Sequence, residues 1–423
     1  MNNLLEKIKN IPTHIKILIC ILIGSFLVKL YFVFAVSDYQ NYLYSDMKGY
    51  WARALQRYTS GSNPVGQTII WPPVYHYYLA GLFSILSYIG LFEKKLEVIL
   101  VLNIIFSTAS VLFVYLISKQ FLSTHFSLIV SVFYAFTYPL IYINAFVMSE
   151  PTCLFLLLAA IYLLLTYTDR KLILFLAGIL FGYAVGIRPS IGLLGLSCAG
   201  YIFFTGGKNI KSFSRTIIFL IGFFIIVLSI SVENYNVSQG RLKGLSAHGG
   251  ANFLLRQCRV GKIICKVTDG MYVLSPPIFN AYPELRQIET VRTRMPFYNQ
   301  KYFYKKGIEC IMEKPLETLG GNFLLFKTLF WGPFFPGRSD VYGYDTFMSI
   351  FNTMIFFMFI SLGLLFIPFK KGLLPRSKNI FLLSIICWIL FTCYLFSTGQ
   401  RQLLPGIFAI YILFFSLMSS LKK

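Results

Sequence analysis

The chain has 423 residues, of which 57% are hydrophobic and only 13% are charged. That composition excludes an ordinary soluble enzyme and indicates a polytopic membrane protein. The net charge of +22 lies mostly outside the apolar segments, where Lys and Arg hold loops in the cytoplasm. No basic surface interleaved with aromatic residues stands apart from the membrane, so we expect no nucleic-acid partner.

Ten apolar stretches approach the length of about 20 residues that a membrane-crossing helix needs. In chain order they are 18–36, 98–117, 126–144, 151–167, 171–187, 190–205, 215–233, 347–369, 379–397 and 402–420. Basic residues cluster at 7–16, 169–171, 208–215, 370–378 and 422–423. With ten spans, the positive-inside rule places all five clusters, and both termini, in the cytoplasm.

One further apolar stretch, 73–92, would invert every later loop if it crossed the membrane. We therefore expect a re-entrant or interface-lying helix, with Tyr75, Tyr77 and Tyr78 at the headgroup level. The segment 322–335 is a second candidate for lying in the interface, because it contains several aromatic residues.

These spans predict an all-α membrane protein, a bundle of about 10 to 12 membrane helices with a helical extracytoplasmic lobe. We divide it into an N-terminal transmembrane module, a large outer lobe and C-terminal transmembrane helices. Their ranges are 1–233, including a first outer loop at 37–72, then 234–345 and 346–423.

The first outer loop carries the most informative acid, Asp46. Ser45 is a candidate N-cap, so that Asp46 would begin a short helix with Tyr50 on the same face and Arg53 and Arg57 further along it. Asp46 can serve there as a carboxylate that accepts a proton from an acceptor hydroxyl. It can equally serve only to stabilise the helix N-terminus electrostatically.

Three more charged residues fall at the outer ends of predicted spans, namely Glu150, Arg188 and Arg401. Glu150 can be a first-turn carboxylate before Pro151. Either arginine can snorkel, with its apolar stem in the membrane and its guanidinium group in water. Two carboxylates and two arginines on one face nevertheless favour a cavity for a phosphate-bearing substrate.

The lobe offers a weaker signal in the run 247–253, where paired glycines permit close backbone approach to a ligand. His248 and Asn252 offer hydrogen bonds to hydroxyl groups, although the run can also be an ordinary turn. The basic residues of the lobe, Arg256 among them, can attract lipid phosphates, but a solvated surface explains most of them.

Cysteines and histidines suggest no cofactor. Cys258 and Cys265 can form a disulfide in an oxidising compartment, with Cys310 as the competing partner. The four histidines lie too far apart in sequence to suggest a zinc cluster. We expect no metal site, while a divalent metal stays an open possibility.

The pattern resembles the GT-C superfamily of polytopic glycosyltransferases, especially the bacterial branch related to protein O-mannosyltransferases and the aminoarabinose transferase of lipid A. The motifs behind the resemblance are Asp46 with Tyr50 and Ala54, then 71–75, 149–151, 182–189, 250–253 and 401–405. The resemblance implies a sugar donor linked to polyprenyl phosphate, used on the extracytoplasmic face. We expect the protein in a bacterial inner (plasma) membrane.

By the same resemblance, Asp46 matches the catalytic carboxylate, and Glu150, Arg188 and Arg401 fall where donor or acceptor contacts are expected. Many relatives have a second acid beside the loop carboxylate, whereas Ser45 stands here. This departure weakens the case for metal dependence and leaves Asp46 as the principal acid.

We therefore expect a membrane glycosyltransferase with Asp46 as base and Tyr50, Glu150, Arg188, His248, Asn252 and Arg401 as substrate-binding residues. Its partners would be the lipid-linked donor, membrane lipids and an unidentified acceptor. The alternatives are a polysaccharide polymerase or ligase and, ranked lower, a transporter or flippase of lipid-linked sugars. A transporter predicts charged residues at mid-span, and these spans carry few.

Overall fold

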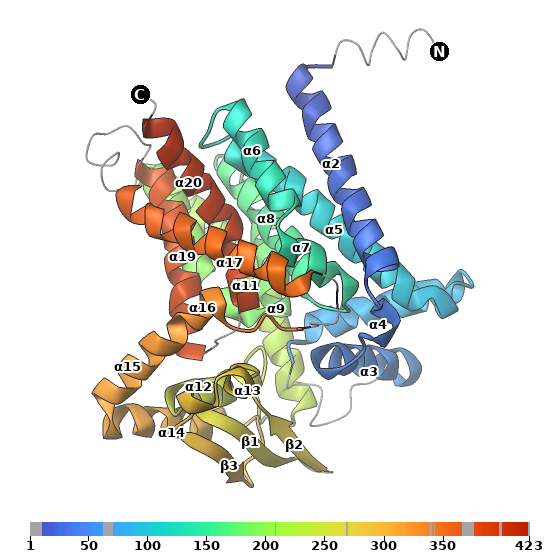
Figure 1. Cartoon of the computed structure of the whole chain (residues 1–423), viewed down its shortest axis with the longest axis vertical. Coiled ribbons are helices and arrows are strands. Elements are labelled where there is room, and N and C mark those ends of the chain that lie inside the picture. The colour runs from blue at the N-terminus through green and yellow to red at the C-terminus, as the bar shows by residue number, and fades with distance from the viewer. Residues whose placement is uncertain are drawn as a thin grey trace.

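The computed structural model describes residues 11–61, 71–207, 209–267, 270–337, 341, 343–365, 376–396 and 400–421. Parts of the predicted basic clusters lie outside these residues, namely 7–10, 208, 370–375 and 422–423, and so do residues 62–70 of the first outer loop. Among the described residues, the first helix is α2 (Thr13–Tyr31) and the last is α20 (Ile407–Leu421). The start of α2 and the end of α20 lie at the end of the bundle away from the lobe (Figure 1).

The described residues contain six helices that are long and apolar enough to cross a membrane, or seven if one bent pair counts as a span. The six are Thr13–Val36 (α2 with η1, Phe32–Val36), Phe92–Ser118 (η3, Phe92–Lys94, with α5, Lys95–Ser118), Ile210–Val237 (α11), Tyr344–Ser361 (α17), Lys378–Phe396 within α19 (Arg376–Phe396) and Gln400–Ser420 (η8, Gln400–Gly406, with α20). In the bent pair, α6 (Thr124–Ala135) meets α7 (Tyr138–Tyr142) and η4 (Ile143–Ala145) at 58°. The chain is a multi-pass membrane protein.

The predicted count of about 10 to 12 membrane helices is not supported. Three predicted spans form shorter apolar helices, α8 (Glu150–Thr166), α9 (Lys171–Ile187) and Pro189–Thr205, which comprises η5 (Pro189–Ile191) and α10 (Leu194–Thr205). A helix of 17 residues, such as α8 or α9, measures about 25 Å at 1.5 Å per residue, which is less than the ~30 Å of hydrocarbon. Polar helix ends at Glu150 and Arg188 shorten these segments.

Helices α3 (Ser45–Ser60) and α4 (Pro73–Tyr88) pack against each other and lie across the end of the bundle near α2 and α5 (Figure 1). The helix α4 is not among the candidate spans. Its buried residues recur every three or four positions, as in an amphipathic helix. Tyr75 belongs to that stripe and is fully buried in the protein, so its ring does not face lipid headgroups, while its depth at the headgroup level stays a prediction.

The helices α9 and α11 pack closely along a row of glycines. A side chain at Gly178 would collide with the backbone oxygen of Phe219, and one at Gly182 would lie 2.8 Å from Cβ of Ile226. Small residues let the two backbones approach each other in this way. Asp169 pairs with Arg215 where both helices begin, and Gly186 faces Ile230 near their other ends, so α9 and α11 run parallel.

The lobe contains a three-stranded sheet, so the prediction of a purely helical lobe and an all-α protein is wrong. The central strand β1 (Val260–Val267) pairs antiparallel with β2 (Gly270–Leu274) and parallel with β3 (Ile288–Thr293). Residues Val260, Ile263 and Cys265 are buried. The β-branched residues of β1 suit a strand, but its eight residues form too short a run for periodicity to separate it from a helix.

Helices cover the sheet and connect it to the bundle (Figure 1). They are α12 (His248–Gln257), α13 (Ile278–Ala281), η6 (Pro283–Leu285), α14 (Gln300–Glu313), α15 (Pro315–Phe326) and α16 (Thr328–Trp331), and the short turns η2 (Tyr39–Asn41) and η7 (Leu362–Leu365) lie elsewhere in the chain. The second predicted interface segment, 322–335, thus contains the end of α15 and all of α16, with Trp331 45% exposed.

A disulfide joins Cys258, at the end of α12, to Cys310 on α14. The pairing of Cys258 with Cys265 is therefore wrong, and the competing partner Cys310 is the one used. The packing of α12 against α14 brings these two cysteines together, whereas Cys265 is buried as a free thiol within β1. Disulfides persist in oxidising compartments, which agrees with a lobe outside the cytoplasm.

Candidate active site

Four charged residues that are far apart in sequence converge at one end of the helical bundle. Asp46 comes from the first turn of α3, Glu150 from the start of α8, Arg188 from the residue after α9, and Arg401 from η8. Nη2 of Arg401 donates a hydrogen bond of 2.8 Å to Oδ2 of Asp46. All four are among the residues selected from sequence, and the structure brings them together.

Glu150 lies between the two arginines. Its Oε1 accepts a hydrogen bond from Nη1 of Arg188 and lies 3.7 Å from Nη1 of Arg401. Nη2 of Arg188 also donates to Oε1 of Gln402 at 2.7 Å. The side chain of Glu150 is only 2% exposed, so this buried carboxylate fixes the spacing of both guanidinium groups.

The local sequence explains why these groups sit at helix ends. Pro151 occupies the first turn of α8, where its fixed φ favours a helix start and where the carboxylate of Glu150 suits the positive helix end. Pro189 disfavours a helical conformation for Arg188, so α9 ends at Ile187 and the arginine leaves the helix in extended geometry. Each polar group is thereby held at the margin of an apolar helix.

The cluster is partly exposed to solvent, and two of its buried polar atoms have no hydrogen bond in the described part of the chain. The side chains of Asp46 and Arg401 are 21% and 19% exposed, and that of Arg188 is 10% exposed. Oε2 of Glu150 and Nη1 of Arg401 are buried without a hydrogen-bond partner in the described part of the chain. Buried polar atoms normally form hydrogen bonds, so two such atoms without one are typical of a ligand-binding site.

Aromatic rings form one wall beside the charged cluster. Tyr50 lies 4.9 Å from Tyr75 and 6.4 Å from Trp71, measured between ring centroids. Trp71 in turn lies 5.1 Å from His248 and 6.0 Å from Tyr272 of β2. The lobe residues His248 and Tyr272 therefore contact the end of the first outer loop at Trp71, and the substrate-binding role of His248 stays a prediction.

Arg53 stacks on this wall. Its guanidinium carbon lies 4.0 Å from the ring centroid of Trp71, and its Nη1 donates to the backbone oxygen of Gly49 at 2.8 Å. A cation over an aromatic face in a buried setting is stabilising. Burial lowers the pKa of Arg53 to about 10, which leaves the guanidinium charged at neutral pH.

Burial also sets the charge states of the two other polar rings. It raises the pKa of Tyr50 to about 12, with the nearby Asp46 and Glu150 adding to the effect, so Tyr50 stays a neutral phenol. Burial, opposed by Asp46, lowers the pKa of His248 to about 4. His248 is consequently a neutral imidazole at pH 7, and its buried Nε2 has no hydrogen-bond partner among the described residues.

The backbone before Asp46 is strained. The helix α3 begins at Ser45 itself, whose φ is +46°, and Ser45 provides no side-chain cap, so its predicted N-cap role is wrong. A non-glycine residue in the left-handed region costs roughly 1–3 kcal/mol and is often found at functional sites. This conformation sets the direction in which Asp46 leaves the loop.

One predicted residue does not join the cluster. Asn252 lies one turn beyond His248 on α12, is half-buried, and forms no hydrogen bond with the described residues around Asp46. Four further side chains belong to the site but were not predicted from the sequence as site residues. They are Arg53, Trp71, Tyr272 and Gln402. The sequence placed Arg53 on the Asp46 face and Gln402 beside Arg401, but it gave no signal that Tyr272 of β2 would reach Trp71.

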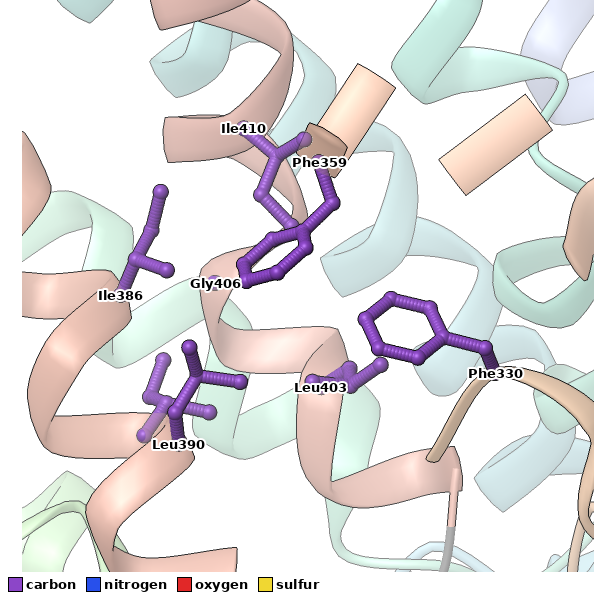
Figure 2. A pocket seen from close by; sticks show the side chains of 8 residues that line it. Phe330, Phe359, Ile386, Leu390, Leu403, Gly406 and Ile410 are labelled. Carbon is purple, nitrogen blue, oxygen red and sulfur yellow. The ribbon is translucent and has the colours of Figure 1, made fainter. Parts of the chain in front are cut away.

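An apolar cavity of about 10 Å³ lies between residues of α16, α17, α19, η8 and α20 (Figure 2). Phe330, Leu403 and Gly406 are among its lining residues, all of which are apolar. It holds about one water-sized sphere, which is a packing gap and far too small for a sugar. The charged cluster, and not this cavity, is the candidate site.

No group of three or more His, Cys, Asp or Glu side chains suited to a metal ion occurs within the described ranges. Asp46 and Glu150 are instead each matched by a guanidinium group.

Residues 71–233 match the family model described as dolichyl-phosphate-mannose-protein mannosyltransferase. Over this range, which is less than half of the chain, the match agrees with the family resemblance found in the sequence. The matched range contains Trp71, Glu150 and Arg188 of the site but not Asp46 or Arg401. No curated protein sequence matches the chain significantly.

Two solved structures from Archaeoglobus fulgidus share the fold over 96% of this chain, each with 12% sequence identity and a TM-score of 0.51. One is an oligosaccharyltransferase tethered with an acceptor peptide, and the other is the oligosaccharyltransferase AglB in complex with an inhibitory peptide and a dolichol-phosphate. This chain covers 49% and 50% of those chains, about half their length. The likeness shows that this chain shares their fold.

Proposed function

We propose that this chain, whose residues 71–233 match the family model described as dolichyl-phosphate-mannose-protein mannosyltransferase, transfers a sugar from a polyprenyl-phosphate donor to an acceptor outside the cytoplasm. The observation that carries the proposal is the convergence of Asp46, Glu150, Arg188 and Arg401 at one end of the bundle. We further propose the three-part division at residues 233 and 345, and a bacterial plasma membrane as the location.

The two arginines suit the phosphate of the donor. A guanidinium group binds phosphate oxygens through paired N–H donors, and Glu150 holds Arg188 and Arg401 close together. Nη1 of Arg401 has an unused donor that can turn to such an oxygen. The bound dolichol-phosphate in the archaeal structure of the same fold supports a lipid phosphate as the donor group.

The proposed reaction is a single displacement with Asp46 as base. The acceptor hydroxyl gives its proton to the carboxylate of Asp46 while its oxygen forms a bond to the anomeric carbon. The bond between that carbon and the phosphate oxygen breaks, and its electron pair stays on the phosphate. Arg188 and Arg401 stabilise the charge that develops on the leaving polyprenyl phosphate.

The charges of the cluster match this course. Asp46, Glu150, Arg188 and Arg401 together carry no formal net charge in the resting site. When Asp46 takes up the proton, the cluster gains one positive charge as the phosphate gains negative charge. The site is thus more complementary to the transition state than to the bound donor, which is the requirement for catalysis.

The aromatic wall supplies the neutral part of the site. The rings of Trp71, Tyr272 and His248 offer apolar faces beside the charged groups, and the neutral imidazole of His248 can bond a sugar hydroxyl through Nε2. Asn252 is a weaker candidate because it stands apart from the cluster.

The rival function, a polysaccharide polymerase or ligase, would need a different placement of arginine and histidine residues. A transporter would need charged residues along the membrane spans. Lys29 is one such residue, buried in α2, and it donates to Ser25 at 2.9 Å on the same helix. That local pairing supports a structural role and gives no reason to prefer transport.

The test is a donor assay with purified protein in lipid vesicles. Polyprenyl-phosphate sugars and the corresponding nucleotide sugars are supplied separately with an envelope extract as the acceptor source. We expect polyprenyl phosphate to be released and labelled sugar to reach the extract only with the lipid-linked donor. Transfer from the nucleotide sugar alone, or movement of the intact donor across the vesicle without cleavage, would contradict the proposal.

A further inference from the structure

A second polar pocket lies at the opposite end of α9 from Arg188. It has a volume of about 400 Å³ and is lined by Asp169, Lys171, Ile210, Lys211, Ser214 and Arg215. The 17 residues of α9 separate this pocket from the candidate active site, a distance of about 25 Å along the helix. The pocket also lies at the start of α11, a candidate membrane span, whereas Gly186, two residues before Arg188, faces Ile230 near the other end of α11. The two sites therefore lie toward opposite ends of a helix long enough to cross the membrane.

The pocket has an excess of positive charge. Three cationic side chains, Lys171, Lys211 and Arg215, and one carboxylate, Asp169, line it. The carboxylate already forms an ion pair, because Nη2 of Arg215 lies 2.6 Å from Oδ1 of Asp169. The exposed side chains of Lys171 and Lys211 have no hydrogen bond or ion pair with any residue in the described ranges. The pocket can therefore accept at least one anionic group without displacing an existing pair.

Two helix N-termini add to the positive electrostatic potential of the pocket. The parallel packing of α9 and α11 places the starts of both helices, Lys171 and Ile210, at the pocket. Each N-terminus carries a partial positive charge and backbone N–H groups without intrahelical partners. Asn209 accepts from the backbone N–H of Ser212 at 3.0 Å, whereas α9 has no side-chain cap, so its first N–H groups stay available.

The surroundings of the pocket indicate a lipid. Leu172, Ile210 and Phe213 are 72%, 79% and 53% exposed, and all three stand in the first turns of the same two helices. Large apolar side chains in such positions are expected to contact hydrocarbon, beside which the lysines reach the headgroup level. Basic pockets between membrane helices on the cytoplasmic side are suited to anionic headgroups.

We propose that this pocket binds the phosphate of an anionic lipid headgroup in the leaflet opposite the active site. The phosphate lies between Lys171 and Lys211 at the paired starts of α9 and α11, while its acyl chains run along Leu172 and Phe213. Because α9 continues to Arg188, an occupied pocket stabilises the helix that carries one of the two proposed donor-binding arginines. Free inorganic phosphate has the same binding chemistry and is the second possible source.

The experiment measures thermal unfolding of the purified full chain in neutral detergent with three additives at equal ionic strength. They are phosphatidylglycerol, phosphatidylcholine and inorganic phosphate. The test variant is Lys171→Gln with Lys211→Gln. The matched control is Lys301→Gln with Lys305→Gln on α14, which removes the same charge from exposed positions of the lobe.

We expect phosphatidylglycerol to raise the unfolding temperature of the wild type and the control more than phosphatidylcholine does. Its apparent affinity should fall about 5-fold for each pocket lysine removed, or roughly 25-fold in the test variant. Protection by inorganic phosphate that the test variant loses would assign the same pocket to free phosphate. Equal effects of the two lipids with no phosphate effect, or a preference that the test variant keeps, would overturn the proposal.

Discussion

Arg401 donates a 2.8 Å hydrogen bond to Asp46 across 355 residues of sequence. The contact joins the start of α3, in the first outer loop, to η8 at the start of the last membrane helix. On the proposed mechanism a donor phosphate competes with Asp46 for Arg401. Donor binding would then release the carboxylate at the moment when it is needed as a base.

Replacement of Glu150 by Gln should impair transfer through the arginines and not through direct chemistry. The change leaves Arg188 and Arg401 with one carboxylate fewer in a site where the Glu150 side chain is 2% exposed. Removing one partner of a buried pair is costly, and we expect kcat/KM for the donor to fall by about 10–100-fold. The conservative Glu150→Asp variant should recover part of the loss, and steady-state kinetics with both variants checks this.

If Glu150→Asp is as impaired as Glu150→Gln while both unfold at the wild-type temperature, then the charge at this position does not organise the arginines.

His76 should make the fold sensitive to mild acid. Its side chain is fully buried, both ring nitrogens lack hydrogen bonds among the described residues, and burial with the nearby Arg53 and Arg57 lowers its pKa to about 3. An unfolded histidine binds its proton near pH 6.5, so between pH 6.5 and 3 the unfolded state holds more protons. The free energy of unfolding should therefore fall as pH falls, by about 2 kcal/mol at pH 5 from this group.

The measurement is thermal unfolding in detergent at pH 7.5 and pH 5.0 for the wild type and for His76→Phe, which keeps a ring of similar size without a titrating group. The variant should lose less stability at pH 5.0 than the wild type does. An identical decrease in both proteins would remove His76 from the explanation.

The glycine row between α9 and α11 gives a packing prediction. In Gly178→Ala the new Cβ would collide with the backbone oxygen of Phe219, which can yield only if the helices separate. Overpacking of this kind costs about 1–3 kcal/mol. The control is Gly200→Ala on α10, where the new Cβ would make only ordinary contacts with Phe204.

Unfolding temperatures in detergent should drop for Gly178→Ala and stay near the wild-type value for Gly200→Ala. Equal values for the two variants would show that the close approach of α9 and α11 is not needed for stability.

The sequence was sufficient to predict the charged cluster because polar groups at the ends of apolar helices are rare and expensive. Glu150, Arg188 and Arg401 each border an apolar segment, and proline neighbours mark the first two of these ends, whereas Asp46 lies in the outer loop that follows the first apolar segment. The lengths of α8 and α9 were harder to predict, because a hydropathy pattern does not reveal that a helix of 17 residues stops short of the bilayer thickness.

The lobe was less predictable because its structure depends on contacts between distant segments. Strand β1 pairs with β3, which begins more than twenty residues after β1 ends, and a short apolar run does not reveal such a partner. A solvated surface is the prediction for most basic residues of the lobe, yet Arg256 is 3% exposed and donates to the backbone oxygens of Tyr394 and Asn322. Contacts between distant segments therefore determine both the pairing of β1 with β3 and the burial of Arg256.

The most direct test of the proposed chemistry compares two single substitutions of acids in the same outer loop. Asp46→Asn removes the carboxylate of the cluster, and Asp38→Asn removes an exposed carboxylate that accepts only from Asn41 at 2.7 Å in the described structure. Sugar transfer from a polyprenyl-phosphate donor by each purified variant is the measurement. We expect kcat to fall by about 10²–10⁴-fold for Asp46→Asn and to remain near the wild-type value for Asp38→Asn. Transfer by Asp46→Asn at the wild-type rate would contradict the account.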